Sequence, residues 1–126
     1  MVETTEGSRV IRLSLPEALD HVAVAALKEE AERAAEDARG PYCLLIDTRS
    51  VRSVEEGALR SMAALERDLA SGGPVLRVAR LVRDPALARA DHEAIAGAGL
   101  LHALGTFADE AEAEAFLASG AREGAP

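Results

Sequence analysis

The spacing of hydrophobic side chains changes period several times along the chain. Apolar and polar residues alternate over residues 10–15, and this period of two predicts a strand with one solvated face. Residues 17–38 instead repeat apolar side chains at helical spacing, which predicts an amphipathic helix with an alanine-rich inner face. After Gly40 and Pro41, which end this helix, residues 42–47 are almost continuously apolar. Such a run predicts a strand covered on both faces.

The second half of the chain repeats the alternation of helix and strand. The expected elements are a helix over residues 58–69, a strand over 75–82, a helix over 84–96, a weak strand over 103–107 and a helix over 109–117. Asp84 and Asp109 supply side-chain oxygens that cap the last two helices. Arg77 and Arg80 interrupt the third strand, and at least one of them is expected at a sheet edge or facing a partner.

This order of elements predicts an α/β fold, a small and mostly parallel sheet of four to five strands with amphipathic helices packed on it. The 126 residues of the chain fit one domain, which is expected over residues 10–117. Residues 1–9 are expected to form a disordered N-terminus, and residues 118–126 a flexible tail. Ligands or partners of parallel sheets bind at the carboxyl ends of the strands. The loops at these ends, residues 47–56 and 83–85, are therefore the candidate site.

Composition narrows the choice of partners. The net charge of −8 repels a phosphate backbone, so nucleic acid is not an expected partner. Lys28 is the only lysine, which excludes Schiff-base chemistry on any other residue and a phosphate-binding loop that ends in GK. Cys43 is the sole cysteine and is expected to be a buried, inert thiol. No apolar run approaches the roughly 18 residues of a membrane span, and no signal segment begins the chain, so a cytoplasmic protein is expected.

Catalytic patterns are weak. The three histidines His21, His92 and His102 are scattered. Asp91, His92 and Glu93 are consecutive on a predicted helix, where side chains diverge by about 100° per residue and cannot bind one metal together. No glycine-rich G-x-G-x-x-G loop follows a strand. We therefore expect no cofactor, no metal and no enzymatic activity.

Several short segments carry a resemblance to a known family. These are ALD at 18–20 followed by VAAL at 24–27, LLID at 44–47 with Val51 four residues later, VARLV at 78–82, and FADEAEAEAFL at 107–117. Together they resemble the STAS family, named for sulfate transporters and anti-sigma factor antagonists, and more closely a divergent STAS-like branch related to the CRAL-TRIO lipid-binding fold. The resemblance covers residues 10–117. Family members usually begin with a two-strand hairpin, whereas the pattern here predicts one strand.

The resemblance implies a single-domain bacterial regulator with a switch loop after the strand 42–47. Counting along the family pattern D-x-x-x-V-x-x-x-D-S-[ST]-G from Asp47, Glu56 stands where the phospho-acceptor serine is expected. The acceptor hydroxyl is therefore absent, and Glu56 is either a permanent mimic of phosphoserine or the mark of a disused switch. Ser50 and Ser53 lie close enough in sequence to accept phosphate if the register slips. The implied switch loop comprises Asp47, Thr48, Arg49, Ser50, Ser53, Glu55, Glu56 and Gly57, with Arg83 and Asp84 at the neighbouring crevice.

Two functions remain open. The first is a non-catalytic cytoplasmic interaction domain resembling an anti-sigma factor antagonist, whose protein partner is a kinase-like anti-sigma factor or another cytoplasmic protein. The alternative is a carrier or sensor of a small apolar ligand, as the CRAL-TRIO likeness implies. A homodimer fits either function, because Arg77, Arg80 and an uncovered strand edge in place of the missing hairpin offer a surface for a second copy.

Overall fold

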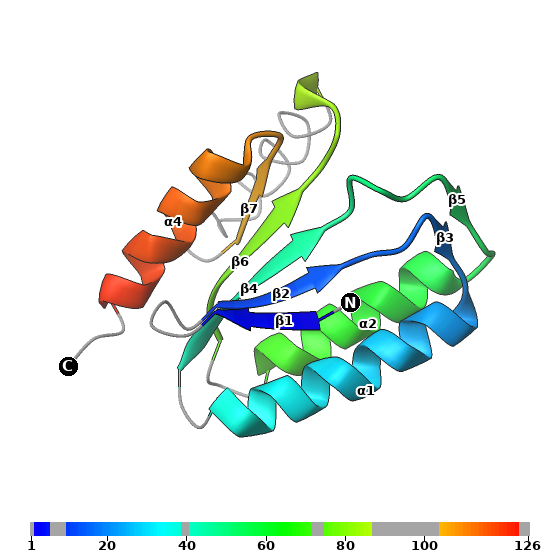
Figure 1. Ribbon diagram of the computed structural model, residues 1–126, viewed down its shortest axis with the longest axis horizontal. Helices are drawn as coiled ribbons and strands as arrows, with labels where there is room; N and C mark the ends of the chain where they lie inside the picture. The colour runs from blue at the N-terminus through cyan, green and yellow to red at the C-terminus, as the bar shows by residue number, and fades with distance from the viewer. Residues whose placement is uncertain (1, 6–9, 39–40, 72–74, 87–103, 124–126) are drawn as a thin grey trace.

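A mostly parallel sheet forms the centre of the protein (Figure 1). The computed structural model describes residues 2–5, 10–38, 41–71, 75–86 and 104–123. Within them the main sheet has five strands, in spatial order β1 (Val2–Thr5), β2 (Val10–Ser14), β4 (Tyr42–Asp47), β6 (Val75–Leu81) and β7 (Leu104–Phe107). β1 is antiparallel to β2, and the other neighbours are parallel. The predicted α/β fold with a mostly parallel sheet is confirmed.

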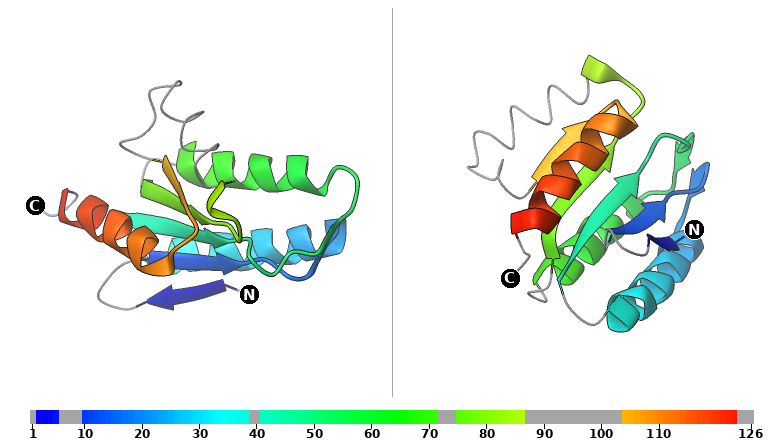
Figure 2. Two further views of the ribbon diagram at one scale, coloured as in Figure 1. Left: turned by 90° about the horizontal axis from the view of Figure 1, so that it is seen from above. Right: turned by 60° about the vertical axis from the view of Figure 1, so that its left-hand side comes forward.

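Helices cover the sheet on both faces (Figures 1 and 2). α1 (His21–Ala38) and α2 (Ala58–Ser71) lie on one face, and α4 (Glu110–Glu123) lies on the other. Successive side chains of β4 point alternately to the two faces, so Leu44 and Ile46 join the core under α1 and α2. Cys43 and Leu45 join the core under α4. This double coverage is why residues 42–46 are apolar and buried.

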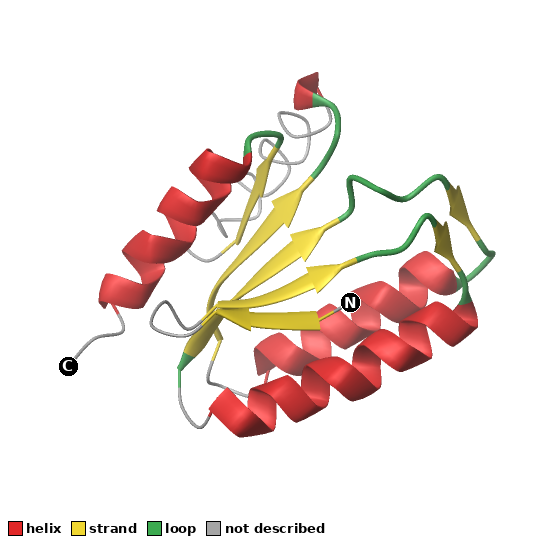
Figure 3. Cartoon of the chain, viewed as in Figure 1, coloured by secondary structure: helices red, strands yellow, loops and turns green. Residues whose placement is uncertain are grey.

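Beyond the carboxyl ends of β2 and β4, a second and smaller sheet extends the fold (Figure 3). β3 (Ala18–Leu19) pairs in parallel with β5 (Ser53–Val54). The helix expected from residue 17 therefore begins only at His21. Asp20 caps it, because its Oδ1 accepts a hydrogen bond of 2.7 Å from the backbone N–H of Ala23.

The two chain ends correct the expected domain limits. Val2–Thr5, expected to be disordered, form β1, with Val2 opposite Leu13 of β2. The hairpin that the pattern did not predict is thus present, and β1 covers the edge of β2 that was proposed for a second copy. α4 continues to Glu123, so most of the tail expected from residue 118 is helical. Residues 6–9 and 124–126 lie outside the described residues.

Arg77 and Arg80, at least one of which was expected at an edge or facing a partner, both contact their own chain. The Arg77 guanidinium carbon lies 4.6 Å from the centre of the Phe116 ring, and its Nη1 donates to the Phe116 carbonyl at 3.2 Å. Arg80 Nη2 lies 2.8 Å from Glu66 Oε2 on α2. Both arginines therefore tie a helix to the sheet.

Among the described helices, none is long and apolar enough to cross a lipid bilayer.

Asp84 and Asp109 act as the caps that the pattern predicts. Oδ1 of Asp84 accepts from the N–H of Ala86 at 2.8 Å, and Oδ1 of Asp109 accepts from the N–H of Ala111 at 3.0 Å. The helix expected over 84–96 lies outside the described residues after Ala86. The weak strand expected over 103–107 is β7.

Candidate functional site

The turn that precedes α2 carries the acidic pair singled out in the sequence. We call residues 55–57 the acidic turn. The Glu55 N–H donates to the Leu19 carbonyl at 2.8 Å, which extends the pairing of β3 with β5. The Gly57 carbonyl then accepts the N–H of Ser61 at 3.0 Å, the first bond of α2. Gly57 has a φ of 85°, in the region that glycine adopts at little cost.

His21, the first residue of α1, holds this turn in place. Its backbone N–H donates to Glu55 Oε2 at 2.9 Å, which also sets a carboxylate at the positive end of the α1 dipole. Its ring Nε2 lies 3.1 Å from the Glu56 carbonyl oxygen. A methyl group on Gly57 would lie 3.4 Å from the His21 ring. Along the sequence His21 is one of three scattered histidines, and no local pattern connects it with residues 34 to 36 positions later.

Glu56 differs from Glu55 in what its side chain does. The Glu56 side chain is exposed and makes no hydrogen bond or ion pair with any residue that the structure describes. Its backbone is fixed by His21, whereas its carboxylate is displayed to solvent. The position at which the resemblance implies a phospho-acceptor is thus a presented negative charge. Ser50 and Ser53, the other two candidates, are also exposed.

At the start of the loop, Asp47 sits in a group of charges rather than in an open crevice. Its Oδ1 accepts from Arg49 backbone N–H at 3.0 Å and Nε at 2.9 Å, and its Oδ2 lies 2.8 Å from Arg49 Nη2 and 2.7 Å from Arg12 Nη2. Glu110 Oε1 completes the group by contacting Arg12 Nη1 and lying 3.5 Å from Arg49 Nη2. We call these four residues the charge cluster.

The hydrogen bonds from Arg49 lower the pKa of Asp47 to about 2, against the opposing effect of its burial and with further help from Arg12. Asp47 is therefore ionised at physiological pH and committed to two arginines. Through these arginines, which also contact Glu110, it links the loop and the first turn of α4 to the sheet. Arg12 and Glu110 were not among the predicted site residues, because they lie 98 positions apart and meet only through the sheet.

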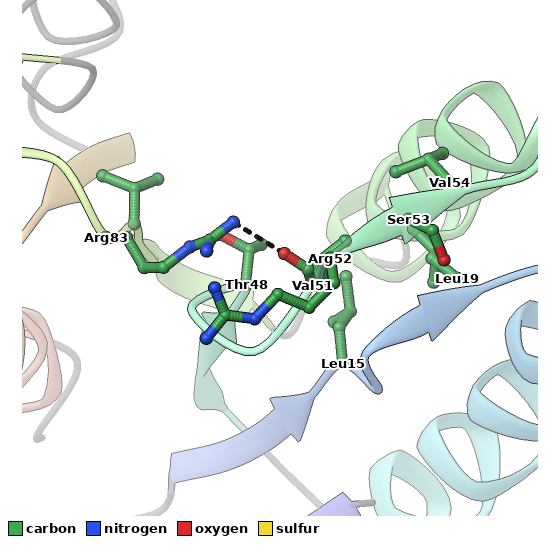
Figure 4. Close-up of a pocket in the computed structure, with 9 residues that line it drawn as sticks. Leu15, Leu19, Thr48, Val51, Arg52, Ser53, Val54 and Arg83 are labelled. Atoms are coloured by element: carbon green, nitrogen blue, oxygen red, sulfur yellow. Dashed lines mark hydrogen bonds between the residues drawn. The ribbon is translucent and has the colours of Figure 1, made fainter.

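The rest of the loop borders a hollow at the carboxyl ends of β4 and β6 (Figure 4). Thr48 Oγ1 donates to the Leu81 carbonyl at 2.7 Å, and Arg83 Nη2 donates to the Val51 carbonyl at 2.7 Å. The hollow has a volume of about 350 Å³ and is lined by Leu15, Leu19, Thr48, Val51, Arg52, Ser53, Val54, Val82 and Arg83. Of the two residues expected at a crevice, Arg83 lines this hollow, whereas Asp84 does not and serves as a helix cap.

Within the part of the chain that the structure describes, no three His, Cys, Asp or Glu side chains are grouped so as to hold a metal ion. Burial raises the pKa of the Cys43 thiol, although the Arg77 backbone and charge oppose this. The histidine candidates His92 and His102, with Asp91 and Glu93, lie outside the described residues.

Comparison with known proteins places the architecture. No protein-family model matches the chain, and no curated protein matches its sequence. Among solved structures, it is similar to an uncharacterized protein of the DUF3478 family from Shewanella loihica PV-4, whose crystal structure has a SpoIIAA-like fold. The TM-score is 0.66 at 19% sequence identity, and the match covers 93% of this chain and 90% of the other. The likeness shows the fold: the chain has the SpoIIAA-like, that is STAS-like, architecture that its motifs predicted.

Proposed function

We propose that the protein is a non-catalytic regulatory domain that binds a protein partner through the acidic turn, residues 55–57. The observation that carries this proposal is the Glu56 side chain, which is displayed to solvent from a backbone that His21 and Gly57 hold in place. A charge on a fixed turn needs little ordering when a partner binds, so less binding free energy is lost. The STAS-like fold supports a partner of the kind that the resemblance implies, a kinase-like anti-sigma factor or another cytoplasmic protein.

Glu56 then supplies a constant negative charge where related domains switch theirs. A phosphoserine carries roughly −1.5 to −2 charges, so a glutamate reproduces part of that charge without a kinase. Because the Glu55 side chain is occupied by the N–H of His21, Glu56 is the member of the pair that a partner meets. Cationic side chains facing Glu56 are the expected complement on the partner.

An apolar ligand carried between sheet and helices has less support. Side chains that face each other there are packed and almost fully buried: Ile11 is 1% exposed, Leu27 3%, Ile46 0% and Leu65 3%. The hollow of Figure 4 opens at the end of the sheet, where the core residues Leu15 and Leu19 line it. A carrier would need to open the packed layer, whereas the acidic turn is already exposed.

Native mass spectrometry of the protein purified gently from its own host tests the proposal. We expect a second polypeptide to co-elute with it and to be lost when Glu56→Arg replaces the displayed charge. The matched control is Glu32→Arg, which makes the same change on the exposed face of α1. Equal loss in both variants, or retention in both, would contradict a contact at the acidic turn.

Whether Glu56 mimics phosphoserine is tested separately, by measuring affinities for the isolated partner. Glu56→Ser and Glu56→Ala should both bind with altered affinity, and phosphorylation of the serine introduced in the first of them should restore the parent affinity. Identical affinities for the parent protein and both variants would show that the charge at residue 56 has no role in recognition.

A further inference from the structure

The hollow beside the loop has a lining with an unusual balance of charge for this protein. Its nine lining residues include two arginines, Arg52 and Arg83, and no carboxylate, although the whole chain carries a net charge of −8. Five of the others are Leu or Val, and the remaining two are Thr48 and Ser53. An apolar floor with two guanidinium groups attracts a ligand that has a hydrocarbon part and one anionic group.

We infer that this hollow binds a small aliphatic ligand with a single anionic headgroup, a carboxylate or a phosphate monoester. Its hydrocarbon part would lie against Leu15, Leu19 and Val51, and its anionic group would meet Arg52 and Arg83 at the rim (Figure 4). The volume of about 350 Å³ lies at the small end of ligand pockets. It suits a compact ligand with a short hydrocarbon part rather than a long lipid chain.

The two arginines are held for this role in different ways. Arg83 donates one N–H to the Val51 carbonyl at 2.7 Å, which fixes its guanidinium over the loop, and its other N–H groups make no hydrogen bond to the residues that the structure describes. Arg52 is held through its backbone, whose N–H donates to the Glu17 carbonyl at 2.7 Å. Its side chain is exposed and forms no ion pair or hydrogen bond with the residues that the structure describes. Two such forks can bind one carboxylate or phosphate from two sides.

This site does not depend on the proposed protein contact. None of the lining residues belongs to the acidic turn, so an experiment can contradict either proposed site without contradicting the other. The two are nevertheless neighbours, because Ser53 and Val54 form one wall of the hollow and lead directly into Glu55.

Titration of the ¹⁵N-labelled protein with hexanoate and with hexyl phosphate, followed by NMR at constant ionic strength, tests the inference. We expect saturable shifts for the amides of residues 48, 51–54 and 82–83, reaching saturation by about 10 mM, a concentration that corresponds to weak millimolar binding. Hexanol and hexylammonium carry the same chain without the anion and should cause no saturable shifts. Hexanoate as the tighter ligand would indicate a carboxylate, and hexyl phosphate a phosphate monoester.

Arg52→Gln supplies the decisive variant, because the Arg52 side chain supports no described contact of the fold. It should weaken binding at least about fivefold, as expected for loss of a charge-assisted hydrogen bond. Arg33→Gln removes the same charge from the outer face of α1 and should leave the affinity unchanged. Arg52→Lys should bind more tightly than Arg52→Gln. Equal binding by Arg52→Gln and the parent, saturable binding of hexanol, or no saturable shift with either anion would overturn the site.

Discussion

Asp47 and Arg49 form a two-pronged ion pair although they are only two residues apart. Asp47 Oδ1 lies 2.9 Å from Arg49 Nε, and Oδ2 lies 2.8 Å from Nη2. The pair folds the start of the loop back onto β4, and Arg12 holds the same carboxylate from β2. The loop that leads to the acidic turn is thus anchored at one end by the charge cluster and at the other by His21.

Acid sensitivity is the first consequence of this pair. The folded pKa of Asp47 is about 2, below its ordinary value of 3.8, so its contribution to stability is complete above about pH 5 and is lost as the pH falls toward 2. Asp47→Asn should lower the free energy of unfolding at pH 7 by about 1–2 kcal/mol, less than the full shift implies because solvent reaches the cluster. Urea denaturation at pH 7 and at pH 2.5 measures the difference.

At pH 2.5 the variant and the parent should be closer in stability, since the parent carboxylate is then partly protonated. Asp37→Asn, on the exposed face of α1, is the control for loss of one negative charge. A stability gap that is as large at pH 2.5 as at pH 7 would mean that Asp47 acts through packing rather than through charge.

Hydrophobic periodicity predicted the parts of this fold that bury a face. Residues 42–46 of β4 are apolar because helices cover the strand on both sides, and the face of α1 that carries Val24 and Leu27 is buried in the core. Hydrophobic periodicity does not predict the strands that are held by backbone pairing rather than by burial of an apolar face. β1 is the polar segment VETT, and β3 and β5 are two residues each, too short to show a period.

The residues of the candidate site also divide into those that the sequence predicted and those that only the folded structure brings together. Asp47 and Arg83 follow strands in the chain, so the rule that sites gather at the carboxyl ends of strands predicted both as candidates, whereas the resemblance to STAS domains implied the role of Glu56. Arg12 and Glu110 required the strand order and register, since they become neighbours only when β2 lies beside β4 and α4 packs across them. The spacing of charges along the sequence contains no record of that register.

Replacement of Gly57 tests how firmly the acidic turn is fixed. Gly57→Ala should lower the free energy of unfolding by about 1–2 kcal/mol, because a φ of 85° is unfavourable for a residue with a Cβ. Gly57→Asn should cost less, since asparagine tolerates this region better. The change is measured by chemical denaturation.

Crowding against the neighbouring His21 ring is a second source of the cost of Gly57→Ala, and it must be separated from backbone strain. A Cβ at residue 57 would lie 3.4 Å from His21 Cε1, an approach that the ring can relieve by a small shift. We therefore expect Gly57→Ala to cost nearly the same in a His21→Ala background. A cost that disappears in this background would assign the effect to crowding, and no cost in either would contradict the strained turn.

Cys43 should behave as an internal reporter of unfolding. Its thiol is fully buried in β4 and lies 3.6 Å from the Leu117 carbonyl, and burial raises its pKa. Both effects suppress the reactive thiolate. Labelling with a disulfide reagent at pH 8 should be slow in buffer and fast in denaturing urea. Rapid stoichiometric labelling of the folded protein would contradict the packing of α4 on this face.

The pairing of β1 with β2 leads to the last prediction, because β1 is the element that the sequence pattern missed. Deleting residues 2–8 should lower the free energy of unfolding by about 1–2 kcal/mol, since the ladder with β2 and the contact of Val2 with the core are both lost. Deleting residues 124–126, which removes a short segment from the other end, is the control.

The same truncation of residues 2–8 leaves the edge of β2 unpaired, and an unpaired edge promotes association with another strand. Light scattering should therefore show a larger increase in mass with concentration for the chain lacking residues 2–8 than for the parent. A truncated chain with the parent's stability and the parent's mass would mean that β1 adds nothing to the fold, as the polar sequence of that segment first suggested.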